Sequence, residues 1–268
     1  MIFQVNGHPT YAYTAGKALD AAKPTVVFIH GVLNDHSVWI LQSRWFANHG
    51  WNVLAVDLAG HCRSAGPPPA SVEDAARFVV ALLDAAGVQK AALVGHSFGS
   101  LIALETAAHA PDRVTHIALV GTAFPMAVSP ALLESSLQTP MRAIDMVNVF
   151  SHSMMAPPPS SLGPGTWLHG GSRALMRRVL ASNREVNVFH VGFNACNDYA
   201  NGDAAMAAVQ CPVLFLLGAA DQMTPPRAAK ALQAKAVGAK VVTVQAGHAL
   251  MSEAPDGVLF ALKDFLAA

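Results

Sequence analysis

The sequence predicts an α/β fold in which a mostly parallel sheet of eight strands is flanked by helices. Short, continuous apolar runs recur along the chain, as expected for strands buried on both faces of a parallel sheet. Helical patterns alternate with these runs, which is typical of parallel strands joined by right-handed crossovers. A length of 268 residues, with 53% hydrophobic and 13% charged residues, supplies an ample core for one such domain.

The first half of the chain alternates between these two kinds of element. Strands at residues 2–5 and 10–14 flank the turn-forming sequence Asn-Gly-His-Pro, which is a good hairpin signal. Ser71 followed by Asp74 indicates the start of a helix, and Gly87 indicates its end. The further predicted strands cover residues 25–30, 51–57, 91–94 and 114–120, and the further predicted helices cover residues 37–49 and 98–109.

Residues 122–203 differ in character from the rest of the chain. Methionines, three prolines at residues 157–159 and glycines at 163, 165, 170 and 171 interrupt short helical patterns, and no buried strand is evident. We therefore predict a helical lid at residues 122–203, inserted after the sixth strand into a core formed by residues 1–121 and 204–268. The core resumes with strands at residues 213–217 and 240–244 and helices at residues 226–237 and 255–267.

The composition argues against several classes of protein. Lys plus Arg and Asp plus Glu number 17 each, so no net field would gather nucleic acid or an anionic membrane. No apolar run approaches the roughly 18 residues of a membrane span, and the N-terminus lacks a signal-peptide pattern, so we expect a cytoplasmic protein, monomeric or dimeric. Cys62, Cys196 and Cys211 lack metal-ligand spacing, as do Asp57 and His61, so we expect no metal and no other cofactor.

The chemistry is expected to centre on the sequence Gly-His-Ser-Phe-Gly at residues 95–99. This pentapeptide lies between a predicted strand and a predicted helix, the context of the G-x-S-x-G nucleophile elbow. The sharp turn forces the serine into a strained backbone conformation, and only very small residues two positions before and after it avoid a clash. Ser97 is therefore the predicted nucleophile.

A serine hydroxyl is a weak nucleophile, so it needs a positioned base and an acid that orients the base. Asp221 and His248 each follow a predicted strand, and loops at the carboxyl ends of parallel strands converge on one edge of the sheet. Asp198 and Asp203, near the end of the predicted lid, are alternative acids; no carboxylate follows the sixth strand, and Asp221 is favoured. We predict the triad Ser97, Asp221 and His248.

With these residues in the order Ser, Asp, His, the chain resembles the α/β-hydrolase superfamily, in the subgroup with a helical lid and a serine nucleophile. The segments that carry the resemblance are His30-Gly31, residues 57–64, residues 95–99, Asp221 and Gly247-His248. Together they span nearly the whole chain and leave the lid unmatched. Cys62 departs from the pattern because it stands where the family's loop usually has a second glycine, and we expect it to be a packed thiol.

The resemblance also implies an oxyanion hole. Its first donor is the amide of Phe98, which starts the elbow helix, whose dipole favours negative charge. The resemblance places the second donor on Val32, the residue after His30-Gly31. The hypothetical substrate pocket is apolar, and its candidate residues are Leu33, Phe124, Trp167 and Leu250.

These residues predict a serine hydrolase, most simply a carboxylesterase acting on hydrophobic small-molecule esters through an acyl-enzyme. Haloalkane dehalogenases and most epoxide hydrolases of this fold use an aspartate nucleophile, so Ser97 argues against both. Carbon–carbon bond hydrolases of ring-cleavage products and cofactor-free perhydrolases use the same triad and remain alternatives. A small-molecule receptor that retains the triad is an alternative of another class.

Overall fold

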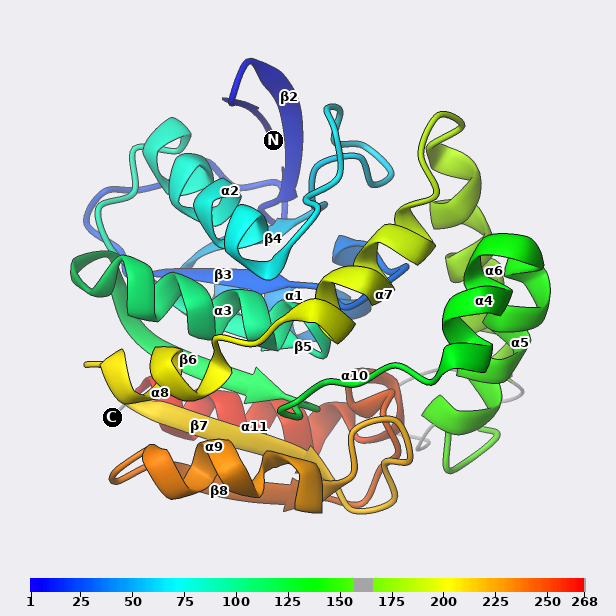
Figure 1. Cartoon of the computed structure of the whole chain (residues 1–268). Helices are drawn as coiled ribbons and strands as arrows, with labels where there is room; N and C mark the ends of the chain where they lie inside the picture. Colours follow the sequence, from blue (N-terminus) through cyan, green and yellow to red (C-terminus); the bar gives the residue numbers. More distant parts are fainter. Residues whose placement is uncertain (157–165, 268) are drawn as a thin grey trace.

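The computed structural model describes residues 1–156 and 166–267. An eight-stranded sheet with the order β1-β2-β4-β3-β5-β6-β7-β8 forms its centre (Figure 1). The strands are β1 (Ile2–Val5), β2 (His8–Tyr13), β3 (Thr25–Ile29), β4 (Asn52–Val56), β5 (Ala91–His96), β6 (Val114–Val120), β7 (Val213–Gly218) and β8 (Lys240–Val244). The helices of the core are α1 (Ile40–Asn48), α2 (Val72–Ala85), α3 (Phe98–His109), α9 (Lys230–Lys235), α10 (Leu250–Glu253) and α11 (Pro255–Leu266).

The topology confirms the predicted fold class. Strands β3 to β8 pair in parallel, whereas β2 is antiparallel to both β1 and β4. Each predicted strand is present, although the hairpin turn is shorter than expected because β2 already begins at His8. Ser71 caps α2 as predicted, since its side chain accepts a hydrogen bond from the Asp74 amide over 3.0 Å. Helix α10, just after residue 248, was not expected from the sequence.

The sheet is buried on both faces, which explains its continuous apolar strands. In β3, Val27 and Ile29 belong to the core cluster that includes side chains of α2 and α3. Val26 and Phe28 of the same strand belong to the opposite cluster, with side chains of α1 and α11. This alternation follows from the two-residue period of a strand. Helices therefore cover both faces of the sheet, and loops extend from its carboxyl edge (Figure 1).

The segment between β6 and β7 contains the remaining α-helices, and its described residues contain no strand. They are α4 (Pro130–Gln138), α5 (Pro140–Ser151), α6 (Leu168–Ser182), α7 (Val188–Asp198) and α8 (Gly202–Ala208). Figure 1 shows α4, α5 and α6 grouped at the end of the sheet toward which β6 and β7 point. A third apolar cluster joins them to Leu33, in the loop after β3, through side chains that include Ile144, Met176 and Phe189.

The glycines of the inserted segment behave differently from the expectation. Gly170 and Gly171 lie inside α6, so the predicted interruption there is wrong. Local packing explains the glycine at position 170, because a Cβ there would come within 2.3 Å of the Trp167 ring. The missing side chain lets that ring lie against the helix. The prolines at residues 157–159 and the glycines at 163 and 165 lie outside the described residues. The domain boundaries at 122 and 203 stay predictions.

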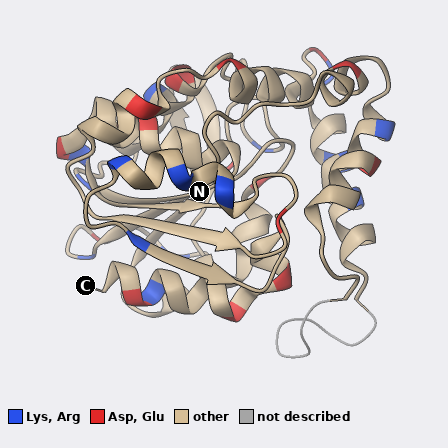
Figure 2. Ribbon diagram, turned by 60° about the horizontal axis from the view of Figure 1, so that its bottom comes forward, with Lys and Arg blue, Asp and Glu red and all other residues tan. Residues whose placement is uncertain are grey.

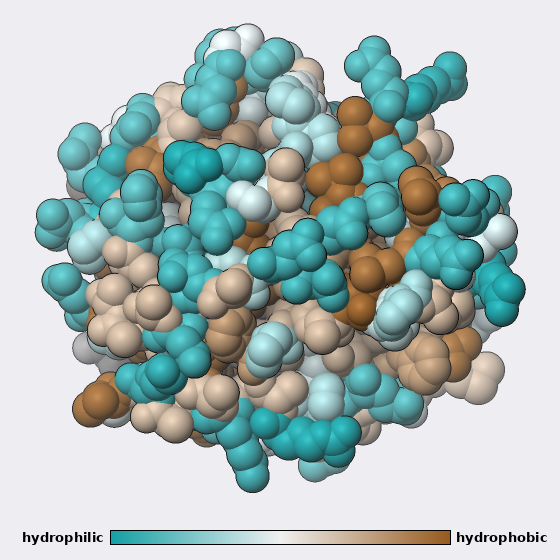
Figure 3. All heavy atoms as spheres, in the orientation of Figure 1, coloured by the Kyte–Doolittle hydropathy of each residue, from teal (hydrophilic) through white to brown (hydrophobic). Residues whose placement is uncertain are grey.

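The surface carries mixed charge and some exposed apolar side chains. Figure 2 shows Lys and Arg interspersed with Asp and Glu over the helices, in keeping with 17 residues of each sign. In Figure 3 apolar side chains gather on the half of the face where α7 and its neighbours lie. Exposed large apolar side chains of the inserted segment include Leu137, Val149, Phe150, Met155 and Trp167. Among the described helices, none is long and apolar enough to cross a membrane.

Candidate active site

Ser97 occupies a strained turn between β5 and α3. Its backbone angles are φ 54° and ψ −118°, in the left-handed region that a residue with a side chain rarely adopts. Two glycines make the turn possible: a Cβ on Gly95 would lie 1.9 Å from the carbonyl oxygen of Gly99, and a Cβ on Gly99 would lie 2.4 Å from that of Ile29. The Ser97 amide donates to the carbonyl of Val120 over 2.9 Å, which ties the turn to β6. The elbow geometry thus follows from the sequence.

Asp221 and His248 come together from the loops after β7 and β8. The Nδ1 atom of His248 lies 2.8 Å from Oδ2 of Asp221, and both side chains are buried. Because an ionised carboxylate only accepts, Nδ1 carries the proton and Nε2 is left as the basic atom. Burial raises the pKa of Asp221, but His248 and hydrogen bonds from Thr224 outweigh burial and bring it below its usual range. Asp221 therefore stays ionised and fixes the imidazole tautomer.

Thr224 completes this pair, although it was not among the residues predicted from the sequence. Its hydroxyl lies 2.8 Å from Oδ2 of Asp221, 3.0 Å from Nδ1 of His248 and 2.9 Å from the carbonyl oxygen of Gly121. Its amide also donates to Oδ1 of Asp221 over 2.8 Å. The short Asp-x-x-Thr spacing is the local signal that could have indicated such a turn. Thr224 orients the carboxylate and links it to the end of β6.

Glu253, in α10, holds the loop that carries His248. Its buried carboxylate accepts hydrogen bonds from the Gly247 amide, from the amide and hydroxyl of Ser153 (2.7 Å each) and from the Met154 amide (3.2 Å). The Ala249 amide donates to the carbonyl of Ser151 over 3.0 Å. The histidine loop is therefore fastened to the segment that follows α5. These contacts of Glu253 were also not predicted from the sequence.

His96 ties the elbow to the same loop. Its Nε2 donates to the backbone carbonyl of His248 over 2.8 Å, and the two rings lie 4.7 Å apart. Burial, together with the proximity of His248, lowers the pKa of His96 to about 3, so its ring is neutral at physiological pH. His96 is thus a packed, hydrogen-bonded neighbour of the serine, as expected.

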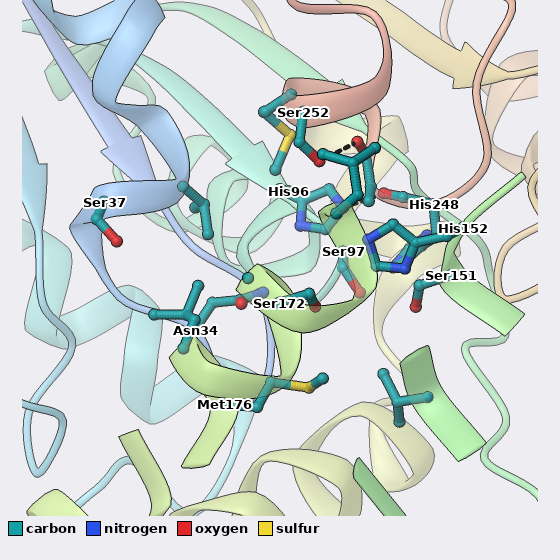
Figure 4. Close-up of a pocket in the computed structure, with 18 of the residues that line it drawn as sticks. Asn34, Ser37, His96, Ser97, Ser151, His152, Ser172, Met176, His248 and Ser252 are labelled. Carbon is teal, nitrogen blue, oxygen red and sulfur yellow. Dashed lines mark hydrogen bonds between the residues drawn. The ribbon is translucent and has the colours of Figure 1, made fainter. Parts of the chain in front are cut away.

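Ser97 and His248 line two adjoining cavities. The first has a volume of about 290 Å³ and runs between the loop after β3, the end of α5 and the start of α6 (Figure 4). The second has a volume of about 280 Å³ and is bounded by residues such as Met126, Met146 and Cys196. Val32, Phe193 and Met223 also belong to both linings. A substrate centred on Ser97 could therefore place one group in each cavity.

The loop that contains Val32 packs directly against the elbow. A Cβ on Gly31 would lie 3.0 Å from Nδ1 of His96 and 3.2 Å from Cβ of Ser97, so glycine permits this close approach. His30 connects this loop to the loop after β4, because its Nδ1 donates to the carbonyl of Gly31 over 2.8 Å and its Nε2 accepts from the Leu58 amide over 3.1 Å. Burial lowers the pKa of His30, consistent with this neutral, doubly bonded ring.

The four apolar candidates for the substrate pocket lie in different places. Trp167 lines the first cavity, although the residue is 58% exposed. Leu33 lies in the apolar cluster of the inserted helices, and Leu250 lies in the core cluster that includes side chains of α1 and α11. Phe124 packs edge-on against Tyr199. Leu33, Phe124 and Leu250 are not among the described residues that line the two cavities.

The residues around Cys62 are held by hydrogen bonds within the protein. Asp57 is buried and accepts from the His36 amide and ring (2.9 and 2.7 Å) and from the Arg63 amide (3.2 Å). His61 Nδ1 donates to the Ala59 carbonyl over 3.0 Å. Burial, with two nearby carboxylates, raises the pKa of Cys62 to about 12, so the thiol stays protonated. These contacts support a role in holding the loop after β4.

Comparison with known proteins shows the family. The chain matches the family model described as alpha/beta hydrolase fold over residues 24–255, and it belongs to that family. An sn-1-specific diacylglycerol lipase from Mus musculus is 28% identical over 258 residues, which cover 92% of this chain and 82% of the lipase. The protein is thus a hydrolase of the alpha/beta-hydrolase fold.

Two further comparisons add less. A dihydrolipoyllysine-residue acetyltransferase component of an acetoin cleaving system, from Cupriavidus necator, is 39% identical over 100 residues, or 36% of this chain. This chain spans only 26% of that relative's length. The solved structure of an esterase from Exiguobacterium antarcticum superposes with a TM-score of 0.84 at 17% identity, covering 100% of this chain and 99% of the esterase. At that identity the likeness concerns the fold alone.

Proposed function

We propose that the protein is a serine hydrolase that cleaves carboxylic esters of hydrophobic small molecules. One observation carries the proposal: the strained Ser97 and the hydrogen-bonded pair His248 and Asp221 meet at the wall shared by two cavities. This arrangement combines a nucleophile, a base and an orienting acid, which is the minimum for acyl transfer. We assign the three residues these roles.

The proposed cycle has two halves. Ser97 Oγ attacks the ester carbonyl carbon while its proton passes to Nε2 of His248, and Asp221 stabilises the resulting imidazolium. The oxyanion accepts hydrogen bonds from the Phe98 and Val32 amides, each worth on the order of 3 kcal/mol in the transition state. The C–O bond then breaks, and the leaving alcohol takes the proton from His248. Water repeats the same steps on the acyl-enzyme and releases the acid and free Ser97.

The two cavities suggest how an ester would bind. We assign one to the acyl group and the other to the alcohol group, because the scissile carbonyl must lie at Ser97, where the cavities adjoin. Their walls are mainly apolar, which favours hydrophobic esters. Leu168 and Met176 of α6 and Val147 of α5 contribute to the first cavity. We therefore propose that these helices act as the lid predicted from the sequence.

A series of p-nitrophenyl esters from acetate to palmitate tests the proposal. We expect wild-type turnover to depend on Ser97, so that Ser97→Ala lowers kcat by about 10⁴–10⁶-fold without unfolding the protein. With about 290 Å³ in the first cavity, we expect short and medium acyl chains to be preferred over palmitate. Absence of turnover by the folded wild type would contradict the proposal and favour a carbon–carbon hydrolase or a receptor.

A further inference from the structure

A histidine outside the triad lines the first cavity beside the candidate catalytic residues. His152 directly follows α5, and it is only 8% exposed. It shares the cavity lining with Ser97 and His248 (Figure 4). Figure 4 shows its ring among the side chains of Ser97, His248 and Ser151. The mechanism proposed above makes no use of it.

The hydrogen bonding of His152 defines its tautomer. Its Nδ1 lies 2.9 Å from the backbone carbonyl oxygen of Asn148, and a carbonyl can only accept, so Nδ1 carries a proton. Burial lowers the pKa of His152 and outweighs the hydrogen bond to Asn148, which raises it, so the ring is neutral at physiological pH. A neutral ring protonated on Nδ1 has a free lone pair on Nε2. Among the described residues, Nε2 has no hydrogen-bond partner.

The ring is also held firmly in this orientation. It packs against His169, with ring centroids 4.7 Å apart, and His169 is tied to α5 because its carbonyl accepts from the Asn148 side chain over 2.7 Å. On either side of His152, the Ser151 carbonyl and the Ser153 amide are bonded to the loop and helix that follow β8. A preorganised acceptor of this kind binds a donor with little loss of conformational entropy.

We propose that Nε2 of His152 accepts a hydrogen bond from a hydroxyl group of the substrate, so that the preferred esters carry a hydroxyl in the half that fills the first cavity. The inference rests on the proposed ester hydrolase. In a mainly apolar cavity, leaving an acceptor without a donor costs more free energy than it does where water can reach the acceptor. A ligand that fills the cavity but lacks the hydroxyl is therefore disfavoured. The hydroxyl lies on the acyl side or the alcohol side, according to which half enters the first cavity.

Binding to a catalytically dead protein tests this inference without requiring turnover. Ser97→Ala would be titrated calorimetrically with ethyl hexanoate, ethyl 3-hydroxyhexanoate and 2-hydroxyethyl hexanoate. We expect one of the two hydroxylated esters to bind about fivefold more tightly than ethyl hexanoate, the gain typical of one added hydrogen bond. Which of the two binds more tightly identifies the half that fills the first cavity.

Substitutions then assign the preference to His152. Adding His152→Phe keeps a ring of similar size but removes the acceptor, and we expect the preference to fall to within about twofold. His109→Phe makes the same change on the exposed end of α3, and the preference should persist. Should His152→Phe fail to fold, His152→Leu replaces it.

Two results would overturn the inference. One is equal binding of all three esters by Ser97→Ala, and the other is a preference that survives the loss of His152. Neither depends on catalysis. Failure of the wild type to hydrolyse any ester would count against the proposed function, whereas the binding preference would still report on His152.

Discussion

Gly95→Ala tests whether the backbone geometry of the elbow is essential. The added Cβ would lie 1.9 Å from the carbonyl oxygen of Gly99, 2.3 Å from its carbonyl carbon and 2.7 Å from the Ser100 amide nitrogen. Ordinary van der Waals contact begins near 3.4 Å, so backbone atoms of β5 and α3 must separate by about 1.5 Å. Because the obstacle is backbone on both sides, no side-chain rotation can relieve the clash.

This displacement allows the size of the effect to be estimated. Overpacking a rigid site costs roughly 1–3 kcal/mol, and we expect the upper end here. For a protein of this size, about 3 kcal/mol corresponds to a lower Tm by roughly 5 °C. A shift of about 1 Å in a nucleophile also costs about 10²-fold in rate, so kcat should fall at least that far.

Thermal unfolding and ester hydrolysis measure the two effects. Gly171→Ala is the matched stability control, because a Cβ there meets no atom within 4 Å and the glycine lies in α6. It should leave Tm unchanged or raise it slightly. If Gly95→Ala kept a Tm within 2 °C of the wild type, or kept full activity, the argument from elbow geometry would be refuted.

Three further predictions concern the buried polar groups. Glu253→Gln should lower the free energy of unfolding by about 2 kcal/mol, because an amide cannot satisfy all the donors around that site, including the Gly247 amide; unchanged urea unfolding would contradict this. Burial lowers the pKa of His61 from 6.5 to about 4, so the unfolded chain binds more protons in that window, and this residue alone should lower stability by up to about 3 kcal/mol as pH drops through it. Stability should therefore fall less steeply over that window in His61→Gln, in which buried histidines such as His96 still contribute, and an unchanged slope would contradict the prediction. Burial raises the pKa of Asp35, but hydrogen bonds from a serine and from Arg178 bring it down to about 2. Arg178→Met should therefore lower the free energy of unfolding by about 1 kcal/mol above pH 4, a modest loss because Arg178 is partly exposed. The loss should vanish as the pH falls toward 2, and a loss that is independent of pH would argue against the ion pair.

The strands and the elbow could be predicted because their signals are local. The strands of a sheet buried on both faces are continuous apolar runs, and the runs at residues 25–30 and 114–120 match β3 and β6 closely. The glycines around Ser97 are required by contacts within a few residues and with β3. The alternation of strand and helix then placed Asp221 and His248 at one edge of the sheet.

The contacts that support the site could not be predicted, because they join distant parts of the chain. Glu253 bonds to Ser153, 100 residues away, and lies in a helix of four residues that has no periodic pattern of its own. Thr224 reaches Gly121 across 103 residues. Such pairs appear only when the topology brings β6, β7 and β8 together.

The apolar pocket residues show a second limit. A leucine or phenylalanine beside the site has the same sequence signal whether it faces a cavity or the core. Leu33 and Leu250 are fully buried in core clusters, and only the packing of the surrounding helices determines this. His152, in contrast, gave no apolar signal and yet lines the first cavity.

The central claim is that Ser97 is the activated nucleophile, and covalent labelling tests it most directly. An alkyl fluorophosphonate reacts with a serine activated by a neighbouring base and an oxyanion hole, whatever the natural substrate. Peptide mass spectrometry should find one label per chain, on Ser97, and labelling should be lost in Ser97→Ala and strongly slowed in His248→Ala. No label, or a label on another cavity serine such as Ser151 or Ser172, would contradict the account.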